Sequence, residues 1–223
     1  ASPTESGQRY FERAVVILSE IEAADLAVAQ AQSAPRGLLR VNAPMSFGTL
    51  RLGPVLADFM EKYPELQLQL ALSDDLLDPV QDGFDVTLRI AELGSSSLIA
   101  RKIVPVARMI CASPDYLARH GTPGHPQDLR EHNCLADQYG GPKTWPFQNS
   151  ARPLLVEVKG SLSSDSNAVL IEMALQGSGI IRVPLYAVKA EVAAKRLEVL
   201  FRTNALSPER MGVYYAKDQR LPA

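Results

Sequence analysis

Two serine-containing turns are the places in this sequence where backbone and side-chain donors could bind a small ligand. Each lies between a predicted strand and a predicted helix. The first turn is Pro44-Met45-Ser46-Phe47-Gly48 and the second is Ser163-Ser164-Asp165-Ser166-Asn167. The residues expected to contact the ligand are Pro44, Met45, Ser46 and Phe47 in the first turn, and Ser164, Asp165 and Ser166 in the second. A serine that caps the helix leaves free N–H groups and the positive end of the helix dipole, which favour an anion. Because open α/β sheets bind ligands where strands end and helices begin, we expect both turns to face one cleft and take a carboxylate or similar anion. For either turn alone, plain helix capping is the alternative.

Arg89 is a third candidate, because it interrupts the otherwise apolar alternation of a predicted strand over 84–90. Its guanidinium could hold a carboxylate in a bidentate manner, with Ile90 and Ala91 following it at the rim of the cleft. The alternatives are an ion pair with Asp85 or Glu92, or a solvated edge position.

Aromatic and histidine side chains give weaker signals. Tyr139 could form an aromatic wall of the pocket together with Trp145 and Phe147, although such residues more often belong to a core. The three histidines are five and seven residues apart, without a pattern of cysteines or acidic residues around them, and are expected at the surface or as caps: His120, His125 and His132. The sequence has no G-x-S-x-G, Walker A, G-x-G-x-x-G or H-E-x-x-H motif. We therefore expect no catalytic residues, no cofactor and no metal.

The composition is that of an ordinary globular protein. The 223 residues are 46% hydrophobic and 22% charged, with a formal net charge of −2, and they suffice for two lobes of roughly 100 residues each. This charge gives no footprint for nucleic-acid binding, so any DNA contact must come from residues outside this sequence. A long apolar run and a leader peptide are missing, which predicts a cytoplasmic location without a membrane partner. Cys111 and Cys134 lie in apolar runs and are expected to be buried, reduced thiols.

The elements that would position these residues alternate between strands and helices. Strands are predicted over 38–43, 66–72, 84–90, 104–112, 134–139, 154–162, 180–183, 197–201 and 211–216, and helices over 47–62, 74–82, 114–120, 166–176 and 184–196. This order predicts parallel sheets with crossover connections. Ser113 as N-cap, Pro114 at the first helical position and Gly121 after the last turn delimit one helix clearly. We expect the last two strands to return to the first lobe, so that two crossings form a hinge.

A long helix is predicted ahead of the first strand, because residues 4–32 contain no Pro and a single Gly in the first turn. Its apolar positions follow a 4-3 spacing, as in a coiled coil, and predict a dimerisation seam. They are Tyr10, Ala14, Ile17, Ile21, Ala24 and Val28. The alternative is an amphipathic helix that lies on its own domain. The breakers over 33–37 mark a boundary after it.

Six segments, spread over nearly the whole chain, resemble the LysR-type transcriptional regulators. Thr4–Ala14 is similar to the segment where the family's wing passes into its linker helix, and Pro35–Val41 to the join between linker and first strand. The other four segments match in the same order: Ala43–Gly48, Gly83–Ile90, Cys111–Leu117 and Gly177–Ile181.

The resemblance implies an α/β fold with two Rossmann-like subdomains of the type 2 periplasmic-binding-protein class, preceded by a long linker helix. The expected parts are a linker helix over 1–34, subdomain I over 38–106 and 203–223, and subdomain II over 107–202. A small effector would bind in the interdomain cleft and alter DNA binding by the winged helix-turn-helix domain, which is absent from this sequence. Implied partners are the effector, DNA, a second or further copies in a homodimer or homotetramer, and RNA polymerase. The alternatives are a solute-binding protein of a transporter and, third, an enzyme on the same fold.

Overall fold

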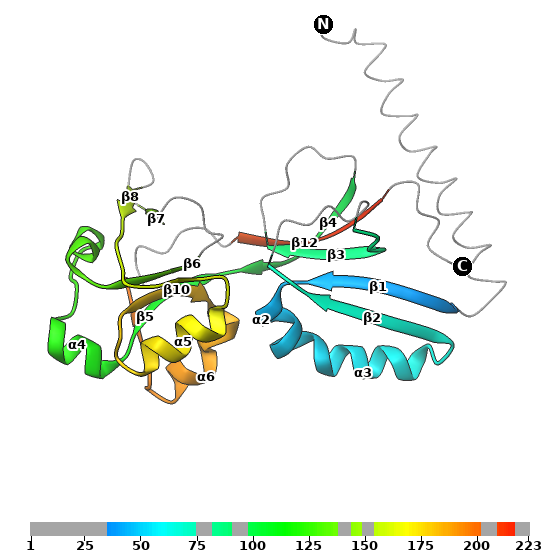
Figure 1. Cartoon of the computed structure of the whole chain (residues 1–223), viewed down its shortest axis with the longest axis horizontal. Coiled ribbons are helices and arrows are strands. Elements are labelled where there is room, and N and C mark those ends of the chain that lie inside the picture. The colour runs from blue at the N-terminus through cyan, green and yellow to red at the C-terminus, as the bar shows by residue number, and fades with distance from the viewer. Residues whose placement is uncertain are drawn as a thin grey trace, which may run out of the picture.

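The computed structural model describes residues 35–74, 82–90, 98–137, 144–148, 154–201 and 209–216 (Figure 1). These residues form two five-stranded sheets, each with its own helices, and a separate two-stranded hairpin. We call the sheet that contains the first strand, with its helix, lobe I, and the other sheet, with its helices, lobe II. The prediction of a two-part α/β fold is confirmed. The predicted helices over 1–34 and 74–82 fall wholly or mostly outside the described residues.

Lobe I is a mixed sheet in the order β2-β1-β3-β12-β4. Its strands are β1 Gly37–Ala43, β2 Leu66–Leu72, β3 Val86–Ile90, β4 Leu98–Val106 and β12 Glu209–Ala216. Strands β2, β1 and β3 are parallel, whereas β12 runs antiparallel to both of its neighbours. The prediction of parallel sheets is therefore wrong for this part. The prediction fails because β12 comes from the distant end of the chain and is not connected to its neighbours by a crossover helix, so it can run antiparallel to them.

One continuous helical segment covers a face of the lobe I sheet. It consists of α2 Met45–Phe47, a π-helical turn Gly48–Leu52 and α3 Gly53–Lys62. A Cβ at Gly48 would overlap the side chain of Leu72, so glycine allows the close approach of helix and strand. The sheet and the helix share a small core that includes Ala43, Leu88 and Met211.

Lobe II also has a mixed sheet, in the order β11-β5-β10-β6-β9. Strand β5 runs antiparallel to both of its neighbours, so the prediction of parallel sheets is wrong here as well. Its strands are β5 Arg108–Ala112, β6 Cys134–Asp137, β9 Ser163–Ser164, β10 Ile180–Pro184 and β11 Glu198–Leu200; the hairpin is β7 Thr144–Phe147 and β8 Leu154–Glu157. The helices are α4 Pro114–His120, the 3-10 helix Pro126–Glu131, α5 Asn167–Leu175 and α6 Leu185–Ala193. The bounds predicted for α4 are confirmed: Ser113 Oγ accepts from the Tyr116 N–H, and Gly121 follows with φ +83°.

The chain passes from lobe I to lobe II with Ala107 as the only residue between β4 and β5. The single strand predicted over 104–112 is therefore wrong: two strands in two sheets share this run. Of the two strands expected to return to lobe I, β12 does so, but β11 stays in lobe II, where it pairs with β5. Because Glu209 at the start of β12 pairs with Val106 at the end of β4, the outgoing and returning strands lie side by side. We call this place the hinge.

Several predicted surface or pocket residues lie in the core of lobe II. Trp145 and Phe147 are buried in its main cluster, which confirms the core position that was the alternative to a pocket wall. His132 is also buried, within hydrogen-bonding distance of the Tyr116 hydroxyl, which contradicts a surface position. It occupies the C-cap position of the 3-10 helix, in agreement with the other predicted alternative. His125 caps the start of the same helix as predicted. Cys134 is buried too, and burial raises the pKa of its thiol to about 12.

Candidate functional site

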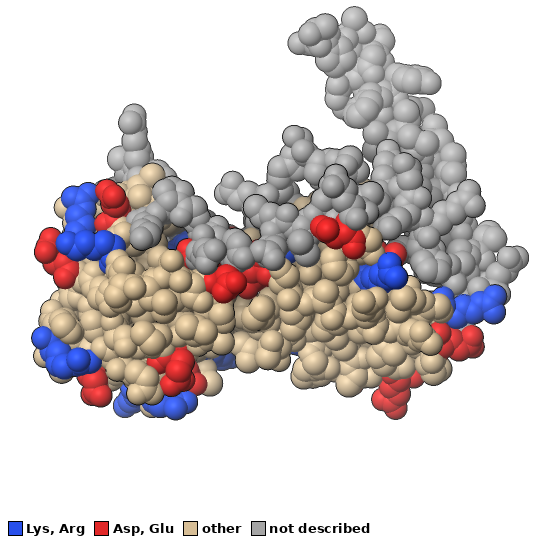
Figure 2. Space-filling model, viewed as in Figure 1, with Lys and Arg blue, Asp and Glu red and all other residues tan. Residues whose placement is uncertain are grey.

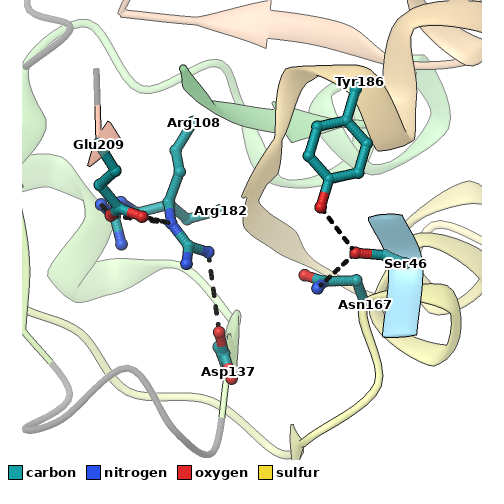
Figure 3. Close-up of polar contacts among 7 residues, drawn as sticks. All are labelled: Ser46, Arg108, Asp137, Asn167, Arg182, Tyr186 and Glu209. Carbon is teal, nitrogen blue, oxygen red and sulfur yellow. Dashed lines mark hydrogen bonds and ion pairs between the residues drawn. The ribbon is translucent and has the colours of Figure 1, made fainter. Parts of the chain in front are cut away.

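Ser46 lies where the two lobes meet. Its Oγ is 3.0 Å from the Tyr186 hydroxyl and 3.5 Å from Asn167 Nδ2, which donates to it (Figure 3). Ser46 comes from α2 in lobe I, whereas Asn167 is the first residue of α5 and Tyr186 the second of α6, both in lobe II. The ring of Phe47 adds an edge-to-face contact with Tyr186 at a centroid distance of 5.7 Å. Residues from three helices and both lobes therefore converge on one hydroxyl group.

The capping role predicted for Ser46 is wrong. The helix begins at Met45, so Ser46 lies inside it. The N-cap residue is Pro44, and no side chain caps the helix. Proline suits this place because it fixes the backbone at the helix start and carries no N–H of its own. The Ser46 hydroxyl is consequently available to lobe II.

The helix start next to Ser46 already holds a carboxylate of this chain. The Met45 N–H donates to the Asp74 side chain, a bond that favours the charged carboxylate. Burial nevertheless raises the pKa of Asp74, and Asp137 of lobe II acts in the same direction. Burial also raises the pKa of Tyr186, which keeps its hydroxyl protonated at neutral pH. The Asp74 side chain therefore lies at one of the two helix starts where the sequence predicted an external anion.

The second predicted turn is occupied by local hydrogen bonds. Ser166 caps α5 as predicted, accepting from the Val169 N–H at 3.5 Å. Ser164 Oγ accepts from the Ser166 N–H at 3.1 Å, and Asp165 is exposed. The side chain that reaches across to lobe I belongs instead to the next residue, Asn167. Its Oδ1 is buried and has no hydrogen-bond partner among the described residues.

Arg89 points toward the end of β2. Its Nη1 donates to the Ser73 carbonyl oxygen at 3.3 Å, and its positive charge lowers the pKa of Asp74 slightly against the larger effect of burial. The alternative partner Asp85 instead accepts from the Arg40 N–H at 2.8 Å. Ile90 packs against the lobe I core. The remaining predicted residues, Ala91 and Tyr139, lie outside the described residues.

Charged side chains at the hinge form a second contact between the lobes. Arg108 and Arg182 of lobe II both donate to the carboxylate of Glu209 in lobe I, and Arg108 also lies 3.7 Å from Asp137 (Figure 3). We call these four residues the hinge ion cluster. It was missed at the sequence level, although the signal that identified Arg89, a basic residue in an apolar strand, also applies to Arg108 and Arg182.

Figure 2 shows acidic and basic side chains of this face scattered around both lobes and not gathered into one basic surface. Within the described ranges, no group of three or more His, Cys, Asp or Glu side chains could hold a metal ion. No helix in that part of the chain is long and apolar enough to span a membrane.

Comparison with known proteins identifies the family. The model of the LysR substrate binding domain matches residues 32–223. The HTH-type transcriptional activator TtdR of Escherichia coli (strain UTI89) is 33% identical in an alignment 225 positions long. This alignment covers 91% of this chain and 72% of the relative. The HTH-type transcriptional regulator CrgA of Neisseria meningitidis is 32% identical over 218 residues, covering 96% of this chain and 73% of the relative.

Solved structures agree with this result. A structure of CrgA, described as a LysR-type transcriptional regulator, matches with a TM-score of 0.77 at 30% identity and covers 98% of this chain and 75% of its own. The full-length Vibrio cholerae activator AphB matches with a TM-score of 0.72 at 26% identity, over 96% of this chain and 74% of its own. These relatives are transcriptional regulators and not solute-binding proteins, which removes the transporter alternative. The chain belongs to the LysR-type transcriptional regulators, and residues 32–223 are the effector-binding domain.

Proposed function

We propose that a small effector binds where Ser46, Tyr186 and Asn167 meet, and that its binding changes the angle between the lobes. The observation that carries this proposal is the 3.0 Å contact between the hydroxyl groups of Ser46 and Tyr186, which come from different lobes. A ligand that replaces this contact touches both lobes at once. It therefore has different affinities for different lobe arrangements, which is the condition for shifting their populations.

The proposed site combines the residues predicted from the sequence with those that the geometry adds. The predicted set is Pro44, Met45, Ser46, Phe47, Arg89, Ile90, Ala91, Ser164, Asp165, Ser166 and Tyr139; the added residues are Tyr186 and Asn167. The expected preference for a carboxylate needs one refinement. Because Asp74 already accepts from the Met45 N–H, an anionic effector would have to displace an internal carboxylate.

Membership in the family supports a proposal for the wider function. We propose that residues 1–34 form the linker helix, that 38–106 with 203–223 form subdomain I, and that 107–202 form subdomain II. The seam residues Tyr10, Ala14, Ile17, Ile21, Ala24 and Val28 would join copies into a homodimer or homotetramer. Effector binding would then alter DNA binding by a winged helix-turn-helix domain, with RNA polymerase as a further partner. We propose that the protein acts in the cytoplasm and is not an enzyme.

Thermal unfolding with a panel of small organic acids, amino acids and sugars tests the effector site, and native mass spectrometry of the purified protein tests for a co-purified ligand. A ligand at a hundredfold excess over its Kd stabilises the folded state by about 2.7 kcal/mol. For a chain of this size, that corresponds to a rise in melting temperature of roughly 5–10 °C. Ser46→Ala and Tyr186→Phe should each reduce the rise, whereas Tyr63→Phe, at the far end of α3, should not. An unchanged rise in both site variants would place the effector elsewhere.

A further inference from the structure

The two strands that join the lobes are held together at the hinge. Ala107 separates β4 from β5, and its carbonyl oxygen accepts from the Leu185 N–H at 2.8 Å, which ties it to the start of α6. Glu209, the first residue of β12, pairs with Val106 in the lobe I sheet. A change in the angle between the lobes must therefore deform the backbone within a few residues of Glu209.

The side chain of Glu209 reaches from the lobe I sheet to two arginines of lobe II. The Arg108 Nε–H donates to both carboxylate oxygens at 2.9 Å, and Arg182 Nη2 donates to one of them at 3.2 Å (Figure 3). Arg108 lies on β5 and Arg182 on β10, which are paired antiparallel. One carboxylate of lobe I thus connects two adjacent strands of lobe II.

The Glu209 carboxylate is the negative charge that both arginines contact by hydrogen bonds. Their side chains are 18% and 19% exposed, so water screens the repulsion between them only in part. Burial lowers the pKa of Arg182, and the positive charge of Arg108 lowers it further, while Glu209 acts in the opposite direction. Asp137 compensates Arg108 as well, at the longer distance of 3.7 Å. Without Glu209, the repulsion between two partly buried guanidinium groups would be offset less well, because Asp137 lies farther from Arg108 than Glu209 does.

We propose that Glu209 is a positioning residue that sets the angle between the two lobes through Arg108 and Arg182. The Ser46–Tyr186 contact and the hinge ion cluster join the lobes at separate places, and the angle depends on both. This proposal goes beyond the effector-binding function, because it concerns the lobe arrangement of the protein without any ligand.

The distance between the lobes can be measured by pulsed electron paramagnetic resonance in the full chain. Glu61→Cys on α3 and Ala118→Cys on α4 place one spin label on an exposed position of each lobe. The native thiols of Cys111 and Cys134 have 0% exposure and should stay unlabelled. Dilution with unlabelled protein removes distances between copies. Against this background, Glu209→Gln should shift the mean distance by more than about 2 Å, the size of a domain rearrangement, or broaden its distribution visibly.

Matched variants separate positioning from a general loss of stability. Glu191→Gln removes the carboxylate of another ion pair, with Arg196, but both residues belong to lobe II, so this variant should leave the distance unchanged. In the Glu209→Gln background, Arg182→Gln removes the repulsion and should move the distance back toward that of the unsubstituted protein. If Glu209→Gln does not fold, Arg182→Gln alone should still broaden the distribution. An unchanged distribution in the folded Glu209 variant would overturn the proposal, as would an equal change in the Glu191 control. If Glu209→Gln does not fold, an unchanged distribution in Arg182→Gln would overturn it.

Discussion

The contact between Ser46 and Tyr186 predicts a measurable coupling between two side chains 140 positions apart in the sequence. Tyr186→Phe removes one hydroxyl group and leaves the ring in place, so it should cost the net value of one hydrogen bond, about 0.5–1.5 kcal/mol. Ser46→Ala should cost more, about 1–3 kcal/mol, because it leaves the hydroxyl of the largely buried Tyr186 without its partner. The double variant removes both groups and should therefore be less destabilised than the sum of the single changes.

Urea unfolding of the four proteins at neutral pH gives the coupling free energy. We expect about 0.5–1.5 kcal/mol, the net value of the hydrogen bond itself. The same cycle with Tyr63→Phe in place of Tyr186→Phe is the control, and its two changes should be additive within about 0.5 kcal/mol. Since burial raises the pKa of Tyr186, the coupling should not change between about pH 6 and pH 9. A Ser46–Tyr186 coupling no larger than the control would refute the contact between the lobes.

Three further predictions concern buried or partly buried side chains: His132, Asp74 and the two cysteines. Burial lowers the pKa of His132, so as the pH falls the unfolded chain takes up a proton at this side chain before the folded protein does. The contribution of His132 to the free energy of unfolding should therefore be complete above about pH 6.5 and decrease below it. In a plot of the urea unfolding midpoint against pH, His132→Asn should flatten the decrease below about pH 6.5. Burial raises the pKa of Asp74 above its usual value of 3.8, so the folded protein loses stability as the pH rises and this side chain becomes charged. Asp74→Asn should therefore raise the melting temperature at pH 7, but not below about pH 4, where the carboxyl group is mostly protonated in both states. Cys111 and Cys134 have 0% exposure, and the Cys134 pKa is about 12; neither should react with a thiol reagent until the protein is unfolded, so rapid labelling of the native protein would contradict the buried positions.

Features fixed by neighbouring residues could be predicted from the sequence. The bounds of α4 follow from Ser113, Pro114 and Gly121, which act within nine positions of one another. The break at Ala107 could not be predicted in this way. Apolar residues continue on both sides of it, and the two halves separate only because one pairs with β12 and the other with β10. These partners lie far away in the sequence, so local periodicity contains no information about them.

The candidate site divides in the same manner. Both serine-containing turns could be found, including Asn167 at the end of the second, because strand ends and helix starts are local features. The contacts of Ser46 with Asn167 and with Tyr186 could not be predicted in this way. The arginines of the hinge ion cluster share the signal of Arg89 and were within reach of the same reasoning. Glu209 could not be identified by that reasoning, because it precedes the strand predicted over 211–216. Its partner Arg108 lies 101 positions away in the sequence.

The position of β12 between β3 and β4 has a consequence for the synthesis of the protein. In the sheet of lobe I, β4 pairs with β12 and with no other described strand. A ribosome completes β4 at residue 106 and then makes all of lobe II before β12 begins at residue 209. Lobe II can therefore fold while the nascent chain still lacks the strand that completes lobe I. During this interval the backbone of β4 is an unpaired edge, open to mispairing with another chain.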